Sequence, residues 1–375
     1  MKALYVGHYK EGTGWSKAAI DLILSMHKVG LDVTCRNIKL TTNESQINPT
    51  LSILENKPLK NIDICIQHVL PHHMVSTSKF KKNIAYYVGE SSTILDTSWA
   101  VNLRYMDEIW IPNHTLKNNL ANDGFTNTRV IPHAFDIEAY SNKSIPSITF
   151  NNAYARNTFK FYYIGEMHDR KNIEAIIRSF HSEFAKHEPV SLILKIKSNT
   201  MSSVDLGQQC QNLCVKIKNE MRIYADIKDY HSEIIIAENL LDEHIEALHN
   251  SCDCFVGPSH GEGWSIPAFH AMCFGNTPIC SKEGGPLDFI DQSDINTGSL
   301  INGVYSVCQH KDPAFQHIFT GKEEWFCPSE SEIKKAMRYY YNNSANIDRS
   351  AGLRHAEKYS YENVGAQIKE ALYAE

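Results

Sequence analysis

Apolar runs alternate with amphipathic stretches from the beginning of the chain. Residues 2–7 form a short apolar run that predicts a buried strand, and a glycine turn follows it. Residues 15–29 then place apolar side chains at helical spacing, and residues 31–33 begin another apolar run. This order of strand, helix and strand predicts a βαβ unit and therefore a parallel sheet.

The same alternation continues to the end of the chain. Further apolar runs predict strands over residues 61–69, 84–88, 106–112, 129–133, 159–165, 190–196, 233–238, 254–256 and 276–280. Helical patterns cover residues 114–120, 173–184, 241–249 and the chain from residue 329 onward. Such alternation is typical of α/β domains with parallel sheets.

Length and periodicity together predict two domains. The chain has 375 residues, which exceeds the size of one ordinary hydrophobic core. Around residues 141–157 the periodicity disappears and Asn and Ser accumulate, which indicates a linker. We therefore expect one domain over residues 1–152 and a second over residues 153–358.

Composition indicates an ordinary globular protein, because 42% of the residues are apolar and 21% are charged. Residues 1–150 carry 15 Lys and Arg against 13 Asp and Glu, whereas the remainder carries 22 against 30. No basic stripe results, which argues against a nucleic-acid partner. Lys79, Lys81 and Lys82 form a small basic cluster, interpreted either as a solvated loop or as a weak peripheral contact with a membrane or an anionic acceptor.

The N-terminal segment and the cysteines predict a cytoplasmic protein. The run at residues 2–7 is too short for a signal peptide, and no apolar stretch approaches the length of a membrane span. A reduced cysteine in or beside an apolar run acts as a small buried hydrophobe. The cysteines in such places are Cys35, Cys65, Cys254, Cys273 and Cys280. Neither the pair Cys252 and Cys254 nor the pair Cys210 and Cys214 has the spacing of a zinc site, so no metal is expected.

Residues 257–275 carry the densest candidate chemistry. A strand is expected just before them, and Pro267 suits the first turn of a helix, where its missing N–H needs no partner. Ser265 is then the expected N-cap, and Gly275 the residue that follows the helix end. The stretch therefore predicts a strand, a loop and a helix.

The loop ahead of this helix has the composition of an anion site. Gly261 and Gly263 let backbone N–H groups approach a ligand closely, and the helix N-terminus adds partial positive charge. A phosphate suits such a place, and the carboxylate of Glu262 suits the hydroxyls of a sugar or ribose. A plain βα turn has the same glycines, so the loop alone leaves both interpretations open.

Two cations and a second glycine loop are further candidates. Arg170 and Lys171 follow a predicted strand, where they would neutralise a diphosphate or serve as solvated surface charge. Gly284 and Gly285 lie in the loop after a later strand. Their N–H groups would point the same way as those of the first loop if the strands are neighbours.

Polar residues also follow the predicted strands of the first half. His68, Glu90 and Asn113 each stand at or after the end of an apolar run. In open α/β sheets ligands bind beyond the carboxyl ends of the strands, so these side chains are candidates for an acceptor or sugar rim. The alternative for His68 is an ordinary loop histidine, as for its neighbours His72 and His73.

Four segments, taken in order, resemble the retaining glycosyltransferases of family 4, which have the GT-B fold. They are the loop at residues 12–14, the strands at 107–113 and 131–133, the strand and loop at 163–172, and the motif at 261–267. The resemblance covers nearly the whole chain. It implies an α/β fold of two Rossmann-like domains facing each other across a cleft, with a last helix at residues 359–375 packing back on the first domain.

The resemblance also implies a role for each candidate residue. Arg170 and Lys171 would hold the diphosphate of a nucleotide sugar, and Glu262 matches the first Glu of the E-x7-E motif that contacts the donor sugar. His270 stands where the family carries the second Glu, which holds the ribose, and Glu166 where it carries an Arg. The further donor-binding positions are Gly12, Gly14, Gly165, Gly263, Trp264, Ser265, Gly284 and Gly285.

The function that this resemblance implies is transfer of a hexose-type sugar from a nucleoside diphosphate sugar to an acceptor hydroxyl, with retention of configuration. The acceptor is a glycan, a lipid or a protein-linked group that the sequence does not name. The resemblance implies no cofactor and no metal. The alternatives are a sugar-nucleotide epimerase or phosphorylase on the same fold, and a catalytically silent binding protein suggested by His270 and Glu166.

Overall fold

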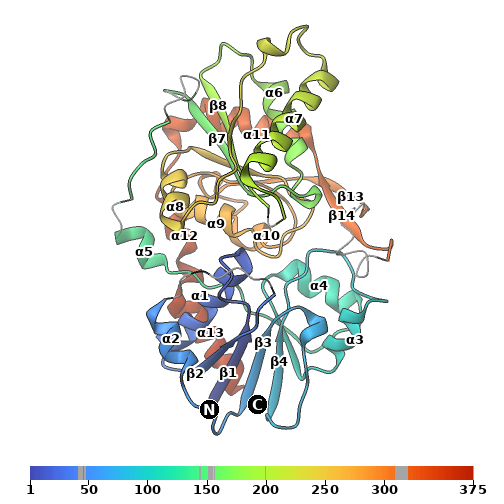
Figure 1. The fold of residues 1–375 in the computed structure, drawn as a ribbon, viewed down its shortest axis with the longest axis vertical. Coiled ribbons are helices and arrows are strands. Elements are labelled where there is room, and N and C mark those ends of the chain that lie inside the picture. The colour runs from blue at the N-terminus through green and yellow to red at the C-terminus, as the bar shows by residue number, and fades with distance from the viewer. Residues whose placement is uncertain are drawn as a thin grey trace. The chain divides into compact units, whose positions relative to one another are not determined.

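The computed structural model describes residues 1–40, 45, 48–142, 145–150, 155, 157–198, 200–308 and 320–374. Contacts divide the chain into two compact units. Unit 1 comprises residues 1–141, 307–324 and 356–375, and unit 2 comprises residues 142–306 and 325–355. Each unit contains a six-stranded sheet with helices packed around it (Figure 1).

Unit 1 is built on a parallel sheet with the strand order β2-β1-β3-β4-β5-β6. Its strands are β1 (Lys2–Gly7), β2 (Asp32–Asn37), β3 (Ile64–His68), β4 (Lys82–Tyr86), β5 (Glu108–Ile111) and β6 (Thr128–Val130). Its helices are α1 (Gly14–Lys28), α2 (Pro49–Glu55), α3 (Ser98–Arg104), α4 (His114–Asn122) and α13 (Tyr361–Tyr373), and α5 (Ile137–Asn142) leads out of it. The strand order reverses at β1, which makes the carboxyl ends of β1 and β3 a topological switch point.

Helices α1 and α13 pack against each other although they come from opposite ends of the chain (Figure 1). A Cβ on Gly365 of α13 would lie 2.5 Å from the carbonyl oxygen of Ser25 on α1, so only glycine permits this approach. The Tyr361 hydroxyl donates to Asp21 Oδ1 at 2.5 Å in the same contact. The last helix therefore belongs to unit 1.

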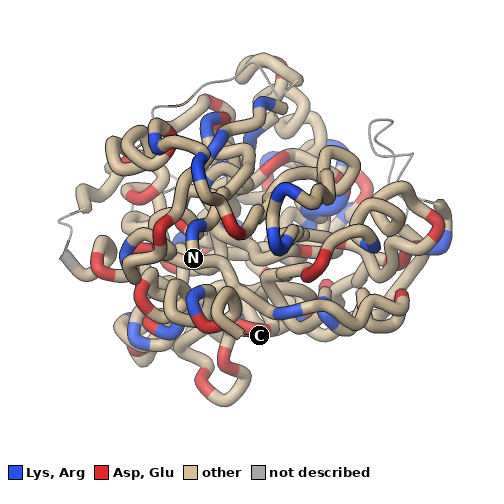
Figure 2. Tube along the Cα trace, turned by 90° about the horizontal axis from the view of Figure 1, so that it is seen from below, with Lys and Arg blue, Asp and Glu red and all other residues tan. Residues whose placement is uncertain are grey.

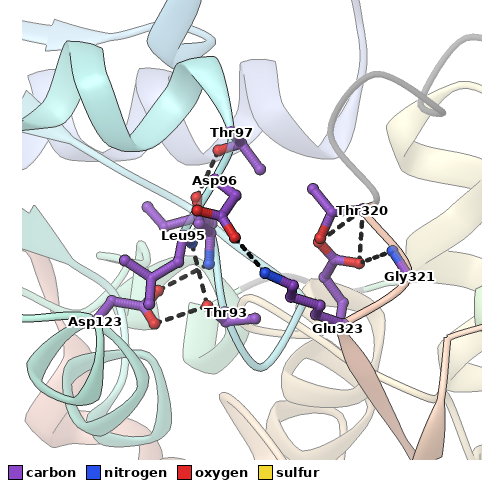
Figure 3. A network of polar contacts seen from close by, with 10 residues as sticks. Thr93, Leu95, Asp96, Thr97, Asp123, Thr320, Gly321 and Glu323 are labelled. Carbon is purple, nitrogen blue, oxygen red and sulfur yellow. Dashed lines mark hydrogen bonds and ion pairs between the residues drawn. The ribbon is translucent and has the colours of Figure 1, made fainter.

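A second late segment also groups with unit 1, which the sequence did not predict. Lys322 Nζ lies 2.5 Å from Asp96 Oδ2, and the backbone N–H of Glu324 donates to Ser92 Oγ at 2.8 Å. The Glu323 carboxylate accepts the N–H groups of Thr320 and Gly321, each at 2.9 Å (Figure 3). These contacts explain why residues 320–324 lie with the loop after β4.

Unit 2 is built on a parallel sheet with the strand order β12-β11-β10-β7-β8-β9. Its strands are β7 (Phe159–Glu166), β8 (Val190–Lys197), β9 (Ile234–Ile236), β10 (Cys254–Gly257), β11 (Ile279–Ser281) and β12 (Ser299–Ile301). Its helices are α6 (Ile173–Glu183), α7 (Ser203–Met221), α8 (Asp242–Asn250), α9 (Ile266–Cys273), α10 (Pro286–Phe289), α11 (Glu330–Asn342) and α12 (Ala351–Ala356). A separate pair consists of β13 (Gly303–Val307) and β14 (Glu324–Pro328).

The sequence placed the boundary after residue 152, whereas the contacts begin unit 2 at residue 142. Asn250 Nδ2 donates to the carbonyl oxygen of Ile145 at 2.9 Å, and the backbone N–H of Ile148 donates to Ser251 Oγ at 2.6 Å. Ile145 and Ile148, within the segment that indicated a linker, are thus hydrogen-bonded to the end of α8. Tertiary hydrogen bonds of this kind leave no periodicity in the sequence.

The longest helix of the described chain, α7, was missed. Its buried positions include Leu206, Cys210, Cys214 and Ile217, which repeat every three or four residues. Cys210 and Cys214 are therefore one face of an amphipathic helix, and both are fully buried. Cysteine and leucine form the apolar stripe of this helix. The sequence interpretation treated the two cysteines only as a possible metal pair, and the helix was therefore not predicted.

Two further features bear on partners. None of the helices in the described ranges combines the length and the apolar character needed to cross a membrane. Figure 2 shows segments of Lys and Arg interspersed with segments of Asp and Glu over the visible face. All ten cysteines of the chain are free thiols, including the five that were expected to be buried.

Candidate active site

Two loops meet at the carboxyl edge of the unit 2 sheet. Strands β7 and β10 are parallel neighbours, so the loops that follow them leave the sheet at the same edge. The loop after β7 contains a short 3-10 turn, Asp169–Lys171, and the backbone N–H of His260 after β10 donates to the carbonyl oxygen of Arg170 at 2.8 Å. This hydrogen bond joins the two predicted motifs into one site.

Asn172 reinforces the junction, and the sequence analysis gave it no role. Its backbone is left-handed, with φ 53°, between the 3-10 turn and α6. Its side-chain Nδ2 donates to the carbonyl oxygen of Pro258 at 3.1 Å. Asparagine tolerates left-handed φ better than most residues, so an Asn just before a predicted helix was the available signal.

Three charged side chains cluster where the loops meet. Lys171 Nζ lies 2.6 Å from Glu262 Oε1, and Arg170 Nη1 lies 3.6 Å from Glu262 Oε2. Arg170 Nη1 also donates to the carbonyl oxygen of Gly261 at 2.6 Å. The structure therefore brings together all three residues predicted to be catalytic, two cations and one carboxylate.

The environment keeps Glu262 ionised. Its side chain is only 10% exposed, and this burial alone would raise the pKa of the carboxyl. Lys171 and Arg170 oppose the burial, and a hydrogen bond from Ser259 adds to their effect, so the pKa lies below its usual value. The cluster carries one negative charge between two positive ones.

The second glycine loop supports Glu262 through the backbone. Strands β10 and β11 are neighbours, as the prediction required, and Gly284 has φ 65°. A Cβ on Gly284 would lie 2.0 Å from the carbonyl oxygen of Glu262, and one on Gly285 would lie 2.3 Å from Trp264 Cα. The N–H of Gly285 donates to that Glu262 carbonyl oxygen at 3.1 Å. Gly285 was predicted to offer its N–H to phosphate, but the loop itself uses this group.

Ser265 stands at the N-cap of α9, as predicted, but it does not cap the helix with its side chain. Its backbone is left-handed, with φ 69°, and no hydrogen bond joins its hydroxyl to the first turn. Trp264 before it is buried, with its ring 5.5 Å from that of Phe289. The left-handed turn therefore lies between a residue anchored in the core and the helix start, while Gly263 precedes both.

His270 lies on α9 and is partly exposed. Its ring is 6.0 Å from that of His249, whose burial lowers the pKa to about 3 and keeps it neutral. His249 Nδ1 shares a 2.7 Å hydrogen bond with the Tyr162 hydroxyl. The position that resembles a family glutamate is thus beside a neutral, buried imidazole, where a second carboxylate would also be desolvated.

Gly165 lies near the end of β7, where the strand meets the loop of the cations. A Cβ there would lie 2.2 Å from the Tyr163 hydroxyl, which donates to the carbonyl oxygen of Glu166 at 3.0 Å. The side chain of Glu166 is exposed. Gly165 therefore makes room for the tyrosine that holds the strand end, and no described contact tests its predicted donor role.

In unit 1, His68 is the last residue of β3, but its side chain is fully buried. Its Nδ1 shares a 2.7 Å hydrogen bond with the Tyr5 hydroxyl, and burial holds the pKa of the imidazole well below its usual value. His133 lies nearby, joined to Tyr86 through Nδ1 at 2.9 Å. The predicted rim residue His68 is thus part of a neutral core cluster and does not lie on the surface.

The other two rim candidates differ from each other. Glu90 is exposed after β4. Asn113 is buried, and its side chain accepts the N–H of Leu116 at 2.8 Å as the N-cap of α4. Glu90 is therefore the candidate whose side chain is open to an acceptor.

Gly12 and Gly14 lie in unit 1, at the start of α1, and both are exposed. Gly12 has φ 64°, and Thr13 caps α1 by accepting the N–H of Ser16 at 3.1 Å. The N-terminus of α1, where partial positive charge favours an anion, therefore lies beside these two exposed glycines. The donor-binding role of these two glycines stays a prediction, because Glu262 and its cations belong to unit 2.

The basic cluster of unit 1 is largely neutralised. Lys81 Nζ lies 2.8 Å from Asp63 Oδ1, and Lys82 Nζ lies 2.5 Å from Glu108 Oε2. Acidic partners thus accompany two of the three lysines that suggested a contact with an anionic surface.

Solved structures show that the fold is GT-B, as predicted from the motifs. The Anabaena protein HepE, solved in complex with UDP-glucose, gives a TM-score of 0.65 at 12% identity, with 99% of each chain covered. Sucrose-phosphate synthase from Thermosynechococcus elongatus gives 0.64 at 13% identity, over 99% of this chain and 98% of its own. OtsA gives 0.67 at 10% identity over 100% of both chains.

A family model matches less than half of the chain. Residues 145–306 match the family model described as glycosyl transferases group 1. This stretch contains Arg170, Lys171 and Glu262. No curated protein matches the sequence. The fold is therefore GT-B, and the matched stretch is similar to glycosyl transferases of group 1, which is a coarser level than the family 4 resemblance of the motifs.

Proposed function

We propose that this protein transfers a sugar from a nucleoside diphosphate sugar to an acceptor hydroxyl and retains the anomeric configuration, as in family 4. The observation that carries the proposal is the cluster of Arg170, Lys171 and Glu262 at the carboxyl edge of the unit 2 sheet. The same stretch matches glycosyl transferases group 1, and a structure of the same fold was solved with UDP-glucose.

Each charged group has a distinct task in this proposal. Lys171 and Arg170 bind the diphosphate and stabilise the negative charge that develops on it as the glycosidic bond breaks. Glu262 accepts hydrogen bonds from the sugar hydroxyls and so orients the ring. The two side-chain cations supply the charge stabilisation that a metal ion supplies in other transferases, and we propose a reaction without metal or cofactor.

The ribose and the acceptor are assigned to further residues. His270 offers one hydrogen bond to the ribose, whereas a carboxylate would accept two. Glu90, exposed on unit 1, is the remaining candidate for the acceptor side, and Gly12 and Gly14 stay proposed donor-binding positions. The partners are thus a nucleotide sugar and a hydroxyl acceptor. A weak peripheral membrane contact stays part of the proposal, with Lys79 as the lysine of the basic cluster beside the ion-paired Lys81 and Lys82. A cytoplasmic location is part of the proposal, in keeping with ten free thiols.

A panel of UDP-, GDP- and ADP-sugars tests this function. We expect one nucleotide sugar to bind and to be slowly hydrolysed, or transferred when an acceptor is present, with the product anomer read by NMR. Interconversion of sugars without loss of the nucleotide would favour an epimerase, and binding without turnover a silent module. Failure of every nucleotide sugar to bind would refute the proposal.

A further inference from the structure

The cations assigned to the diphosphate are already paired, and their partner is the carboxylate assigned to the sugar. Lys171 Nζ is 2.6 Å from Glu262 Oε1, and Arg170 Nη1 is 3.6 Å from Oε2. The side chain of Lys171 is 17% exposed, that of Arg170 16% and that of Glu262 10%. Water therefore screens the attraction between Lys171 and Glu262 only weakly. A diphosphate that enters the site therefore competes with Glu262 for Lys171.

The main chain of Glu262 is held in place, and its side chain is only 10% exposed. Its carbonyl oxygen accepts the N–H of Gly285 at 3.1 Å, and the backbone around Gly284 leaves no room even for a Cβ. When phosphate oxygens take over Lys171, the carboxylate stays buried and loses its nearest cation. A buried charge in that position costs free energy unless hydrogen-bond donors replace the lost partner.

Only one of the two relevant ligands supplies such donors. A nucleoside diphosphate sugar brings hydroxyls to Glu262 together with its diphosphate. The nucleoside diphosphate that remains after transfer brings none. Both ligands break the ion pair between Lys171 and Glu262. Only the nucleoside diphosphate sugar replaces it with hydrogen bonds to the Glu262 carboxylate.

We propose that Glu262 is an internal competitor of the diphosphate, and that this competition makes the site discriminate a nucleotide sugar from its spent nucleoside diphosphate. The inference rests on the proposed function. Glu262 thereby favours binding of the nucleotide sugar and promotes release of the nucleoside diphosphate after transfer. It acts as a specificity-determining residue in addition to its contact with the sugar.

The variant Glu262→Gln tests the competition, because it keeps the side-chain shape and removes the charge. The probes are UDP-glucose and the methyl ester of UDP, which carry the same diphosphate charge and differ in the sugar hydroxyls. We expect Glu262→Gln to bind the methyl ester about tenfold more tightly than the wild type does. Affinity for UDP-glucose should rise less, so the preference for UDP-glucose should shrink in calorimetric titrations.

Glu174→Gln is the matched control. Glu174 lies in the first turn of α6, just after the loop of the cations, and undergoes the same chemical change, but its side chain is exposed and has no assigned role in the site. It should leave the ratio of the two affinities as in the wild type. An equal shift in both variants would mean that net charge alone acts, and the proposal would be wrong.

Proton uptake gives a second measurement that needs only the wild type. The pKa of Glu262 lies below its usual value while Lys171 and Arg170 are its partners. Loss of Lys171 to the methyl ester lets burial raise this pKa, so binding near pH 5 should take up protons, whereas UDP-glucose should take up fewer. Titrations in buffers of different ionisation enthalpy measure the difference.

The outcomes separate this inference from the proposed function. Tighter ester binding by Glu262→Gln with a reduced preference for UDP-glucose supports the competition. Unchanged or weaker ester binding, or equal proton uptake with both ligands, overturns it while the glycosyltransferase function stands. If the wild type binds only another base from the nucleotide-sugar panel, the corresponding ester replaces the UDP ester. If it binds no nucleotide sugar, the proposed function and this inference fail together.

Discussion

Two residues other than glycine adopt left-handed backbone conformations in the candidate site. Asn172 has φ 53° and Ser265 has φ 69°. Asn172 offsets its strain with the hydrogen bond to Pro258, and Ser265 turns the chain between buried Trp264 and α9. Such conformations cost about 1–3 kcal/mol and persist where surrounding contacts enforce them, which is common at functional sites.

Lys171→Ala tests the diphosphate assignment at the same scale. We expect it to weaken nucleoside diphosphate sugar binding at least about tenfold, because a charge-assisted contact to phosphate is lost. Isothermal titration calorimetry measures the change. Lys216→Ala is the control, since Lys216 is 62% exposed on α7 and pairs only with Glu220 of that helix in the described structure. Unchanged affinity in Lys171→Ala would place the diphosphate elsewhere.

His249 predicts a pH dependence of stability. Its folded pKa of about 3 lies below the value of 6.5 expected when unfolded, so the unfolded state binds a proton more readily. This contribution to stability is complete above pH 6.5 and is lost as the pH falls toward 3. Between pH 7.5 and 5 the loss is about 2 kcal/mol. Denaturant unfolding of His249→Gln should show a shallower pH profile over this range, and an unaltered profile would contradict the buried neutral state.

At the scale of elements, the absence of a side chain at a glycine allows the close approach of α1 and α13. Gly365 of α13 faces the Ser25 carbonyl of α1, whereas a Cβ on Gly207 of α7 would meet only the Ala237 side chain at an ordinary 3.6 Å. The two glycines are chemically identical and stand inside helices. Because their environments differ, replacing each glycine by alanine should change the free energy of unfolding in opposite directions.

Gly365→Ala and Gly207→Ala form a matched pair of variants. Gly365→Ala should destabilise unit 1 by about 1–3 kcal/mol, because the methyl group forces α13 away from α1. Gly207→Ala should stabilise the protein by about 0.5–1 kcal/mol through the lower entropy of the unfolded chain. Urea unfolding monitored by circular dichroism measures both. Similar effects of the two changes would show that helix propensity alone acts.

Elements were largely predictable wherever the apolar periodicity was strong. All of the strands from β1 to β11, apart from their exact ends, followed from apolar runs in the sequence. The short helices α2 and α3 and the strands β12 to β14 did not, because these segments are stabilised by neighbours that are distant in sequence. β13 contains Val304, Tyr305 and Val307, which favour a strand, although the whole strand is exposed.

At the scale of the whole molecule, the candidate donor residues are divided between two units. Arg170, Lys171 and Glu262 belong to unit 2, and Gly12 and Gly14 belong to unit 1. The sequence predicted this division only through a family resemblance. Each unit has its own sheet and its own core, so ligand binding need not protect both equally.

Hydrogen exchange in the presence of a saturating nucleoside diphosphate tests that division. Ligand at about one hundred times its Kd stabilises the binding unit by about 2.7 kcal/mol. We expect slower exchange in peptides from residues 166–172 and 258–265, read by mass spectrometry. Protection that also reaches residues 12–14 would support their donor role, and protection confined to unit 1 would contradict the site in unit 2.

The sequence by itself determined the α/β class and the parallel sheets, because these follow from periodicity. It offered Arg170, Lys171 and Glu262 as candidates from local loop chemistry, and only the resemblance to family 4 assigned them roles. The tertiary structure decided what those residues contact. The junction between the loops after β7 and β10 pairs Lys171 with Glu262, and the loop after β11 directs the Gly285 N–H toward the Glu262 carbonyl oxygen. In unit 1, packing around the end of β3 buries His68. Distances across parallel strands depend on how the sheet brings remote segments together, and no local pattern encodes them.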